Sequence, residues 1–410
     1  MRTAALSNAT ARRLVVVPLD PIETYERAGH ADYLEAYFNP GGMFDEVFAV
    51  SPLERGRRRA FGVTIIGADE QAFAATVRRI RPDVIRAYGG LWCSDLVCRR
   101  RVAGIPVVVS VHDSLPQRVF PSVRYADLVV CMSEAVRRQV LAVGTDPRRT
   151  RLLPNRIDRS VFRPVRDAAA LRSISSRFPP GRYILHIGRK DRQKNIDTVI
   201  RALATLPPDY HAVFVGQGDR SPYVALASQL RVESRCFWID AIPNFELPKW
   251  YSWCDCMCVP SRWEGFGFVF IEAAACGAAV VTSDIGPMNE YLSDGVSATL
   301  VKEYEDPGAI ASAIRRVCED VEYRRHIIAG AEVAARPFDR PMVDAAEMAI
   351  YREAMALPHE PLGRRLEIRT WKARQTVRDA TSSSMRRVRR SLSFLRSVMV
   401  SRHGLPPAGA

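Results

Sequence analysis

Short apolar runs alternate along the chain with longer stretches in which apolar residues recur every three or four positions. The runs predict strands, and the stretches between them predict amphipathic helices. In the first half the expected strands lie within residues 12–20, 45–52, 62–69, 84–87, 107–111 and 126–132. Because the later strands are apolar and alternate with helices, the pattern predicts a parallel sheet covered on both faces.

The alternation stops at residues 163–180, where apolar residues are sparse and the segment ends in Pro-Pro-Gly. It restarts with expected strands at 183–189, 210–219, 236–240, 256–261 and 278–284. The sequence therefore predicts an α/β protein of two doubly wound domains, residues 1–165 and 166–340. Ligands of such sheets bind beyond the carboxyl ends of the strands, so we expect both sets of strand ends to face a central cleft.

Length and composition agree with this organisation. The 410 residues exceed one ordinary core and fit two domains. The apolar share of 47% and the charged share of 25% are typical of a soluble globular protein. The first 20 residues contain only the short apolar run Leu14–Val17, which predicts neither a signal peptide nor a membrane span. We therefore expect a cytoplasmic protein.

The nine cysteines contain no Cys-x-x-Cys pair. Cys254, Cys256 and Cys258 alternate along an expected strand, so their side chains would face one side of it. We interpret them as buried thiols in a reducing compartment, and not as disulfides or metal ligands.

Two glutamates, Glu264 and Glu272, lie in the otherwise apolar segment 260–277. The expected strand ends there, a loop with two glycines follows, and a helix starts near Phe268. Glu264 then lies on the loop and Glu272 in the second turn of the helix. Free N–H groups at a helix start attract anions and hydroxyl oxygens, which favours a ligand site. The alternative is an ordinary turn with two solvated glutamates.

A basic turn follows another expected strand. It carries Arg189 and Lys194, and Asn195 is a candidate cap for the next helix. Two cations and a helix start at the end of a strand favour a diphosphate site, because charge-assisted hydrogen bonds contribute roughly 1.5–3 kcal/mol each. Gly216–Asp219 forms a third glycine-rich strand end. The alternative is a solvated basic turn.

Together these stretches resemble the retaining GT-B glycosyltransferases of family 4. That family carries PS-x-x-EGFG-x-x-x-x-EA-x-A-x-G, which residues 260–277 match nearly throughout. It also carries GR-x-x-x-x-K, matched by Gly188, Arg189 and Lys194. Further matches, IRPDVI, GIPVVVSVHD and VVCMSEAV, lie at 80–85, 104–113 and 129–136. The resemblance covers roughly residues 80–355 and implies two Rossmann-like domains.

The resemblance implies a nucleotide-diphosphate sugar as the donor, with Arg189 and Lys194 holding its diphosphate. Glu272 would accept hydrogen bonds from the ribose hydroxyls, and Glu264 would face the transferred sugar. His112 matches a family histidine near the sugar, although without the family it reads as a plain strand-end histidine. The other donor-side residues that it implies are Gly188, Gly216, Gly265, Phe266 and Gly267. Ser133 and Glu134 read as helix-capping residues.

The activity that the resemblance implies is transfer of a hexose-type sugar to a saccharide or lipid-linked acceptor, with retained configuration. It needs no cofactor, and since no Asp-x-Asp metal motif lies in a suitable loop, we expect no metal. Residues 341–360 would form the helix that crosses back to the first domain.

Two features depart from the family. The first loop, residues 18–42, lacks a clear glycine-rich pattern, so Gly29 or Gly41–Gly42 remain the candidates to lie beside the donor phosphates. Arg156 replaces the glycine of the family's PNG-x-D phrase, which could alter the hinge between the domains.

Other functions stay open as alternatives: a nucleotide-sugar epimerase, a phosphorylase, or a non-catalytic GT-B binding module. A phosphorylase needs a pyridoxal-phosphate lysine, for which the sequence offers no clear candidate. A binding module has no use for the combination of Arg189, Lys194, Glu264 and Glu272.

The net charge of +14 is concentrated in the C-terminal tail, residues 361–410. From residue 363 onward, twelve Arg and Lys against two acids give +10 and leave +4 for the rest. Met385, Val388, Leu392, Leu395 and Met399 would share one helix face flanked by arginines. This pattern favours an interfacial helix on the anionic inner membrane face. A disordered tail or a docked helix are alternatives, and nucleic acid is disfavoured because no aromatic platform accompanies the arginines.

Overall fold

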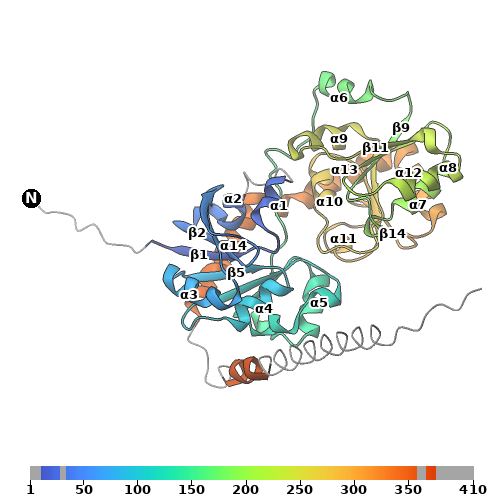
Figure 1. Cartoon of the computed structure of the whole chain (residues 1–410). Coiled ribbons are helices and arrows are strands. Elements are labelled where there is room, and N and C mark those ends of the chain that lie inside the picture. The colour runs from blue at the N-terminus through green and yellow to red at the C-terminus, as the bar shows by residue number, and fades with distance from the viewer. Residues whose placement is uncertain (1–10, 28–33, 358–365, 375–410) are drawn as a thin grey trace, which may run out of the picture. The chain divides into compact units, whose positions relative to one another are not determined.

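A computed structural model describes residues 11–27, 34–357 and 366–374. The chain divides into two compact units, residues 1–357 and 358–410, and the first unit contains two sheets (Figure 1). In the second unit residues 366–374 are helical, whereas the predicted membrane face at 385–399 lies outside the described residues. No helix in the described ranges is both long and apolar enough to cross a bilayer.

The first sheet contains eight strands among the described residues, and all its pairings are parallel except that of β3 with β4. Its strands in spatial order are β3 (Arg57–Ala60), β4 (Val63–Gly67), β2 (Glu46–Ser51), β1 (Arg13–Val17), β5 (Val84–Tyr88), β6 (Val107–Val111), β7 (Leu128–Cys131) and β8 (Thr150–Leu152). The six expected strands are confirmed. Strand β3 was not predicted because three consecutive arginines carry no apolar signal, and they are exposed at the sheet edge.

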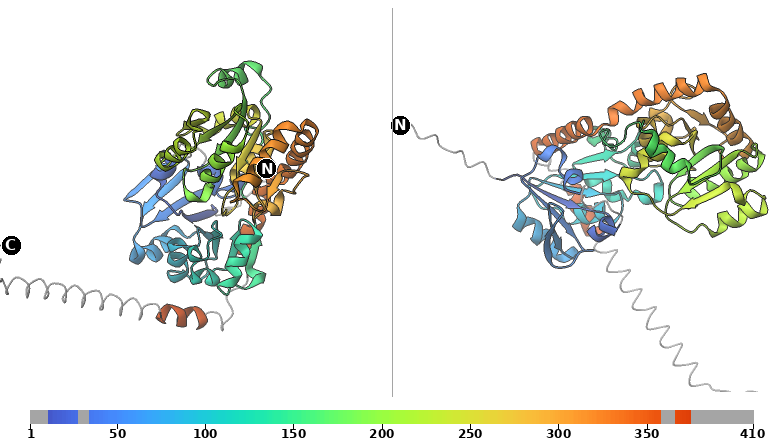
Figure 2. Two further views of the ribbon diagram at one scale, coloured as in Figure 1. Left: turned by 90° about the vertical axis from the view of Figure 1, so that its right-hand side faces the viewer. Right: turned by 90° about the horizontal axis from the view of Figure 1, so that it is seen from above.

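Helices connect these strands and cover the sheet (Figure 2). They are α1 (Ile22–Arg27), α2 (Leu34–Phe38), α3 (Glu70–Ile80), α4 (Trp92–Arg99) and α5 (Glu134–Ala142). The predicted cap of α5 is confirmed: the Ser133 hydroxyl accepts a hydrogen bond from the amide of Val136 at 3.2 Å. The chain leaves this helix through Gly144, whose φ of +87° suits glycine.

The second sheet contains six parallel strands among the described residues. In spatial order they are β11 (Cys236–Ile239), β10 (Tyr210–Val215), β9 (Arg182–Ile187), β12 (Cys256–Val259), β13 (Val280–Ser283) and β14 (Thr299–Val301). Counted within this domain, the order is 3-2-1-4-5-6, which is that of a Rossmann fold. Such a sheet changes its winding direction between the first and fourth strands, here β9 and β12. The predicted architecture of two doubly wound α/β domains is therefore confirmed.

The helices of the second domain follow the predicted alternation. They are α6 (Ala168–Ser175), α7 (Ile196–Thr205), α8 (Ser221–Gln229), α9 (Leu247–Trp253), α10 (Phe268–Ala275), α11 (Met288–Tyr291), α12 (Pro307–Glu319) and α13 (Val321–Ala335). Helix α6 occupies the segment that the sequence pattern presented as a boundary. Strand β14 was not predicted because its three residues are too short for a periodic signal.

The linker after β8 is paired with the segment that precedes the last long helix. The amide of Ile157 donates to the Phe338 carbonyl at 2.8 Å, and the amide of Arg340 donates to the Ile157 carbonyl at 2.9 Å. Helix α14 (Arg340–Ala356) then packs against β5 and against the short turn η2 (Pro40–Gly42) of the first domain. The two segments that connect the domains therefore run side by side.

Gly41 lies against this last helix. A Cβ atom added there would sit 2.9 Å from Sδ of Met348 on α14. The positive φ of +59° and this close approach explain why a glycine occupies position 41. Gly29, the other candidate, lies outside the described residues.

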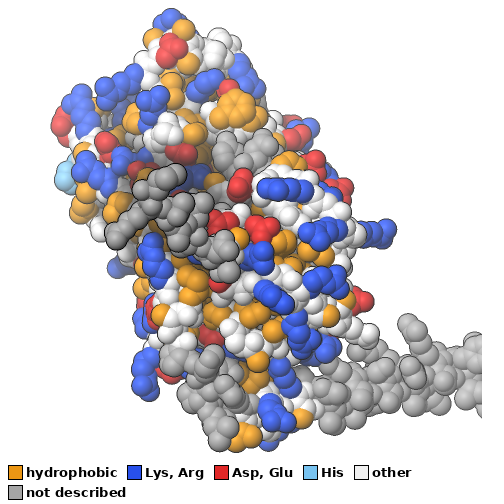
Figure 3. All heavy atoms as spheres, turned by 90° about the vertical axis from the view of Figure 1, so that its left-hand side faces the viewer, with side chains coloured by type: hydrophobic (Ala, Val, Ile, Leu, Met, Phe, Trp, Pro, Cys, Tyr) orange, Lys and Arg blue, Asp and Glu red, His pale blue; other side chains and the backbone are white. Residues whose placement is uncertain are grey.

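The cysteines agree with their interpretation as buried thiols, and the surface charges agree with the small net charge expected outside the tail. All nine cysteines are free thiols, and each is buried except the half-buried Cys254. On the face in Figure 3, basic side chains are spread among acidic and apolar ones.

Candidate active site

Two loops lie side by side where the second sheet changes its winding direction. One follows β9 and contains Gly188–Lys194, and the other follows β12 and contains residues 260–267. Because β9 and β12 are paired neighbours, both loops emerge at the same sheet edge. Open α/β sheets bind their ligands at this position.

Lys194 and Glu264 form a buried ion pair across the two loops. The Lys194 Nζ lies 2.5 Å from Oε1 of Glu264, and the residues are 9% and 5% exposed. The carboxylate also accepts hydrogen bonds from the Ser261 hydroxyl at 2.8 Å and from Nε2 of Gln193 at 3.3 Å. An ionised carboxylate persists in such a site only when it is paired and hydrogen-bonded. The ammonium has three N–H donors, of which Glu264 takes one.

Glycines let the lysine side chain lie across the strand ends. A Cβ atom at Gly188 would sit 2.9 Å from Cδ and Cε of Lys194. At Gly216 it would sit 2.0 Å from the carbonyl oxygen of Gly188. The structure therefore places Gly188 against the Lys194 side chain and Gly216 against the backbone of Gly188, and both glycines permit close packing.

Arg189 lies at the surface of the same loop, with its side chain 69% exposed. Its Nε donates to Asp191 at 2.9 Å, and its Nη2 donates to Oε1 of Gln193 at 2.8 Å. Since Gln193 also contacts Glu264, Arg189 is linked to the buried ion pair through one side chain.

The structure adds Lys190, to which the sequence analysis assigned no role. Lys190 is buried, and its ammonium donates to the carbonyl oxygens of Gly216 and Ile239 at the ends of β10 and β11. Burial lowers its pKa. No sequence signal separates this lysine from its neighbours, because its partners come from two other strands.

Asn195 has a different role from the one predicted. It sits at the start of α7 with φ +56°, and its side chain makes no capping hydrogen bond. Instead its Nδ2 donates to the carbonyl oxygens of Pro260 and Tyr304, each at 2.9 Å. The side chain therefore fastens the loop after β9 to the loop after β12.

The loop Gly265–Gly267 contacts the first domain. The carbonyl of Gly265 accepts a hydrogen bond from the Ser133 hydroxyl at 3.0 Å, and a Cβ atom at Gly265 would sit 1.9 Å from the carbonyl oxygen of His112. Only glycine fits this approach. The strand ends of β6 and β7 therefore meet the loop after β12, as the expectation of facing strand ends requires.

The rest of that loop is anchored by aromatic packing. Phe266 is buried against Tyr291 and Phe338, and the Tyr291 hydroxyl donates to its carbonyl at 2.7 Å. Gly267 begins α10 with φ +85°, a conformation that favours glycine.

A second contact joins the domains at α5. The Glu290 carboxylate accepts hydrogen bonds from the amides of Glu134 and Ala135 at 2.6 and 2.7 Å. A carboxylate at the N-terminus of a helix is favoured by the helix dipole. Glu134 therefore contributes its backbone to this contact, which agrees with its interpretation as a helix-start residue.

His112 follows β6 and lines a hollow in the first domain. Burial, with a smaller effect from Arg86, lowers the pKa of His112 to about 4. The imidazole is therefore uncharged at neutral pH and can exchange hydrogen bonds with a sugar without acting as a cation.

Glu272 lies on α10, and Tyr251 of α9 donates a hydrogen bond to its Oε2 at 2.9 Å. Burial raises the pKa of Glu272 to about 7, and the Tyr251 hydrogen bond opposes this shift. Among the described residues no hydrogen bond joins Glu272 to Lys194 or Glu264, so the structure places it apart from that ion pair.

The raised pKa predicts a pH dependence of nucleotide binding. The resemblance implies that ribose hydroxyls donate to the ionised Glu272 carboxylate, and on that expectation affinity for a nucleoside diphosphate should rise up to about tenfold from pH 6 to pH 8. Glu272→Gln should bind more weakly at pH 8 and lose this rise. Calorimetry gives a pH profile of affinity for the wild type and for Glu272→Gln, and the difference between the two profiles is free of the titration of the phosphate itself. Parallel pH profiles would reject the ribose role.

Stability should show the opposite trend. The pKa of Glu272 is higher in the folded protein than in the unfolded chain. Its carboxyl therefore stabilises the fold below about pH 4 and loses this contribution as pH rises through 7. Urea unfolding of the same two proteins at pH 5 and pH 8 measures this contribution.

Comparisons with known families cover both domains. Residues 168–333 match the family described as Glycosyl transferases group 1, and residues 24–161 match Glycosyltransferase Family 4.

Two relatives are both D-inositol 3-phosphate glycosyltransferases. The protein from Catenulispora acidiphila is 31% identical over 320 residues, which cover 67% of this chain and 72% of the relative. That from Xylanimonas cellulosilytica is 31% identical over 264 residues, covering 62% of this chain. The chain spans 60% of the length of that second relative.

Solved structures share the fold at lower identity. Anabaena Alr3699/HepE in complex with UDP-glucose has a TM-score of 0.69 at 19% identity and covers 85% of this chain and 100% of its own. WaaG, a glycosyltransferase involved in lipopolysaccharide biosynthesis, has a TM-score of 0.64 at 15% identity, covering 83% and 99%. These two sheets, the paired loops at β9 and β12 and the matches over both domains lead to one assignment: the chain belongs to the family 4 glycosyltransferases and has the GT-B fold.

Proposed function

We propose that the chain transfers a hexose-type sugar from a nucleotide-diphosphate sugar to a hydroxyl group of an acceptor. One observation carries this proposal: the buried pair of Lys194 and Glu264 at the winding change of the second sheet. The pair places a cation that suits a diphosphate beside a carboxylate that suits the hydroxyl groups of a sugar. HepE, which shares the fold, is described in complex with UDP-glucose, and this supports a nucleotide-sugar donor.

In the proposed reaction the bond between the sugar C1 and the diphosphate oxygen breaks, and its electron pair leaves with the diphosphate. A new bond forms between C1 and the acceptor oxygen, whose proton passes to the leaving diphosphate. Lys194 and Arg189 stabilise the charge that grows on the diphosphate, because fixed positive groups act strongly in a partly dry site. Glu264 positions the sugar, and His112 supplies an uncharged hydrogen-bonding group.

We propose that the reaction retains the anomeric configuration through attack on the face from which the diphosphate leaves. The acceptor is a saccharide or a lipid-linked hydroxyl compound. Two relatives are named D-inositol 3-phosphate glycosyltransferases, which supports an acceptor that carries hydroxyl groups.

We propose that the positive charge for the leaving group comes from Lys194 and Arg189, so transfer needs no metal. Addition of EDTA should therefore leave the rate of transfer unchanged within about twofold, and added Mg²⁺ or Mn²⁺ should not raise it further. The release of nucleoside diphosphate gives the readout. Loss of activity with EDTA and its recovery with one metal would contradict metal independence.

A thermal-shift screen with UDP-, GDP- and ADP-sugars tests the donor assignment. A bound donor stabilises the folded protein by about 2.7 kcal/mol at a concentration 100 times its dissociation constant. One base should raise the melting temperature by several degrees, and its sugar should then be transferred. No shift with any of the three donors would count against the proposal.

We propose a peripheral position at the cytoplasmic membrane face, based on the basic and periodically apolar sequence of the tail. The full chain should co-sediment with vesicles containing phosphatidylserine and stay in solution with phosphatidylcholine vesicles alone. A chain lacking residues 363–410 should stay in solution with both. Equal binding of the two proteins to the anionic vesicles would reject the membrane role of the tail.

A further inference from the structure

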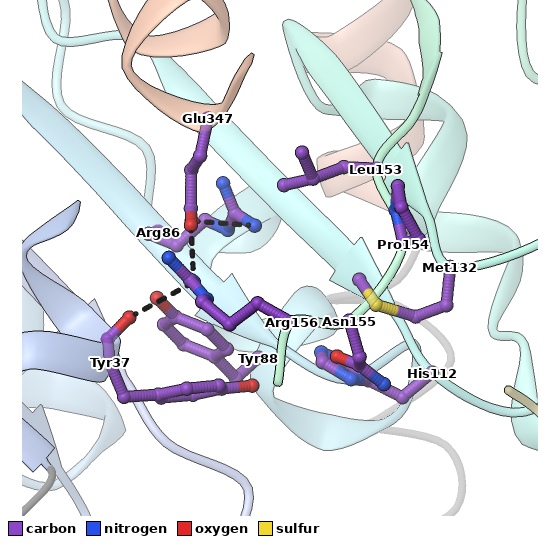
Figure 4. A pocket seen from close by; sticks show the side chains of 10 residues that line it. All are labelled: Tyr37, Arg86, Tyr88, His112, Met132, Leu153, Pro154, Asn155, Arg156 and Glu347. Atoms are coloured by element: carbon purple, nitrogen blue, oxygen red, sulfur yellow. Dashed lines mark hydrogen bonds and ion pairs between the residues drawn. The ribbon is translucent and has the colours of Figure 1, made fainter. Parts of the chain in front are cut away.

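Four charged side chains meet where the linker after β8 passes helix α14. They form the Arg156 cluster, which consists of Arg86 from β5, Arg156 from the linker, and Asp344 and Glu347 from α14. Glu347 lies between the two guanidinium groups, 3.2 Å from Nη2 of Arg86 and 2.5 Å from Nη2 of Arg156 (Figure 4). Arg86 and Glu347 are 1% and 0% exposed. Because loss of one member from a buried charge group is costly, the cluster holds the linker to the first sheet and to α14.

The cluster lies directly beside the place where the two connections between the domains cross. Ile157, the next residue of the linker, forms an isolated β-bridge with Asp339, and its amide donates to the Phe338 carbonyl at 2.8 Å. Phe338 in turn packs against Phe266 of the loop after β12 and against Tyr291. The crossing is therefore fixed to the first domain on one side and to the second domain on the other.

The residue type at position 156 affects how freely this crossing can rotate. Domains rotate about a few loop residues that absorb changes in φ and ψ. The family phrase PNG-x-D has glycine at this position, and the glycine backbone is the most permissive. This chain has Arg156 instead, and its planar guanidinium group donates to two carboxylates of α14. Rotation of the backbone at residue 156 would break these contacts.

We infer that Arg156 is a positioning residue that restricts rotation at the crossing and holds the two domains close together. The close approach is visible at Gly265, whose carbonyl accepts a hydrogen bond from the Ser133 hydroxyl at 3.0 Å and which leaves no room for a Cβ atom beside the His112 carbonyl. Lys194 lies in the second domain and His112 in the first, so a diphosphate binds to one domain while transfer uses both. The inference rests on the proposed transfer reaction and assigns Arg156 to the step that uses both domains.

Two backbone amides report on separation of the domains. The amides of Glu134 and Ala135 at the start of α5 donate to the Glu290 carboxylate of the second domain at 2.6 and 2.7 Å. The first amides of a helix have no partner inside the helix, so these two exchange with solvent when the domains separate. The amide of Val140 lies in the interior of the same helix and exchanges only when the helix itself opens.

Hydrogen exchange of the full chain, resolved by fragmentation mass spectrometry, tests the inference. In Arg156→Gly the amides of Glu134 and Ala135 should exchange at least about fivefold faster than in the wild type, while the Val140 amide stays slower than both. Glu290→Ala is the positive control, because it removes the acceptor of both amides.

Asp344→Asn is a milder variant of the same cluster. It keeps the size of the side chain and removes the charge of one carboxylate that accepts from Arg156. The two amides at the start of α5 should exchange about twofold faster in this protein. The experiment therefore remains decisive even if Arg156→Gly does not fold.

Kinetics separate positioning from stability. Arg156→Gly should lower kcat at least about fivefold, because small displacements of reacting groups slow a reaction strongly. Its affinity for the nucleoside diphosphate should stay within about twofold of the wild type, since the cluster lies outside the second domain. Arg156→Lys, which keeps the charge, should recover part of kcat. Arg325→Ala is the matched control, because Arg325 forms an exposed pair with Glu322 and its loss should change neither quantity.

Unchanged exchange of the Glu134 and Ala135 amides in both cluster variants would overturn the inference. Equal acceleration of the Val140 amide would also overturn it, because the helix would then be unfolding and the domains would not be separating. An unchanged kcat in folded Arg156→Gly, or a parallel loss of diphosphate affinity, would contradict the positioning role. If the wild type binds no nucleoside diphosphate, the proposed function fails, while the exchange experiment still decides whether Arg156 restricts the domains.

Discussion

Lys194→Ala is expected to lower the rate of sugar transfer at least tenfold. The Lys194 ammonium is buried at the winding change of the second sheet, and in the proposed reaction it stabilises the diphosphate as the bond to the sugar breaks. A tenfold loss corresponds to about 1.4 kcal/mol of transition-state stabilisation. Removal of one preorganised donor from other active sites costs about 2.7–4 kcal/mol, so the tenfold value is a lower bound.

The same substitution leaves Glu264 with hydrogen bonds from Ser261 and Gln193 but without its cation. The melting temperature must therefore be measured together with transfer from a radiolabelled donor. Lys249→Ala is the matched control, because Lys249 of α9 forms a partly exposed pair with Glu246, which precedes this helix, and its loss should change neither quantity by much. If Lys194→Ala folds with unchanged turnover and unchanged donor affinity, Lys194 does not hold the diphosphate.

Arg156→Gly, which restores the residue of the family phrase, is expected to destabilise the protein by about 3–5 kcal/mol. Arg156 lies in the linker and donates to Asp344 and Glu347 of α14, and more weakly to the Tyr37 carbonyl at 3.4 Å. Glu347 is fully buried and, within the described residues, would keep its contacts with Arg86 and Tyr351. The substitution therefore removes one partner from a buried ion network, so that Asp344 loses the Arg156 cation and Glu347 keeps Arg86 alone of its two cations.

Urea unfolding followed by circular dichroism measures this effect, and Arg156→Lys should give an intermediate loss because it keeps the charge without the planar fork. Arg325→Ala serves as the control, since the pair of Arg325 with Glu322 is exposed and should change stability by less than about 0.5 kcal/mol. A loss below about 1 kcal/mol in Arg156→Gly would show that the network contributes little to the fold.

The sequence predicts the architecture well because the strands that form it are apolar and regularly spaced. Fully buried strands such as β6 and β7, and helices with Ser133 and Gly144 at their ends, carry their signals locally. The short strand β14 and the arginine-rich edge strand β3 carry none, so only their pairing with neighbours defines them.

The candidate site is predictable in part, since the motif residues follow strand ends and the strand order brings Lys194 to Glu264. The periodicity of the sequence does not identify the hydrogen-bond or ion-pair partner of a polar side chain that distant elements bury. Lys190 carries no sequence signal of its own, and Asn195 is predicted to be a helix cap, until their carbonyl partners are known. Arg86 interrupts an apolar strand, and its neighbours in the sequence do not explain it, because its partner Glu347 lies on the last long helix.

The central claim is that the loops after β9 and β12 bind the donor diphosphate through Lys194. Calorimetry of a nucleoside diphosphate and its monophosphate, with the base selected by thermal shift, tests it most directly in the wild type, Lys194→Ala and Lys249→Ala. The wild type and the Lys249→Ala control should bind the diphosphate at least tenfold more tightly than the monophosphate, and this preference should largely disappear in Lys194→Ala. An equal preference for the diphosphate in all three proteins would contradict the assignment.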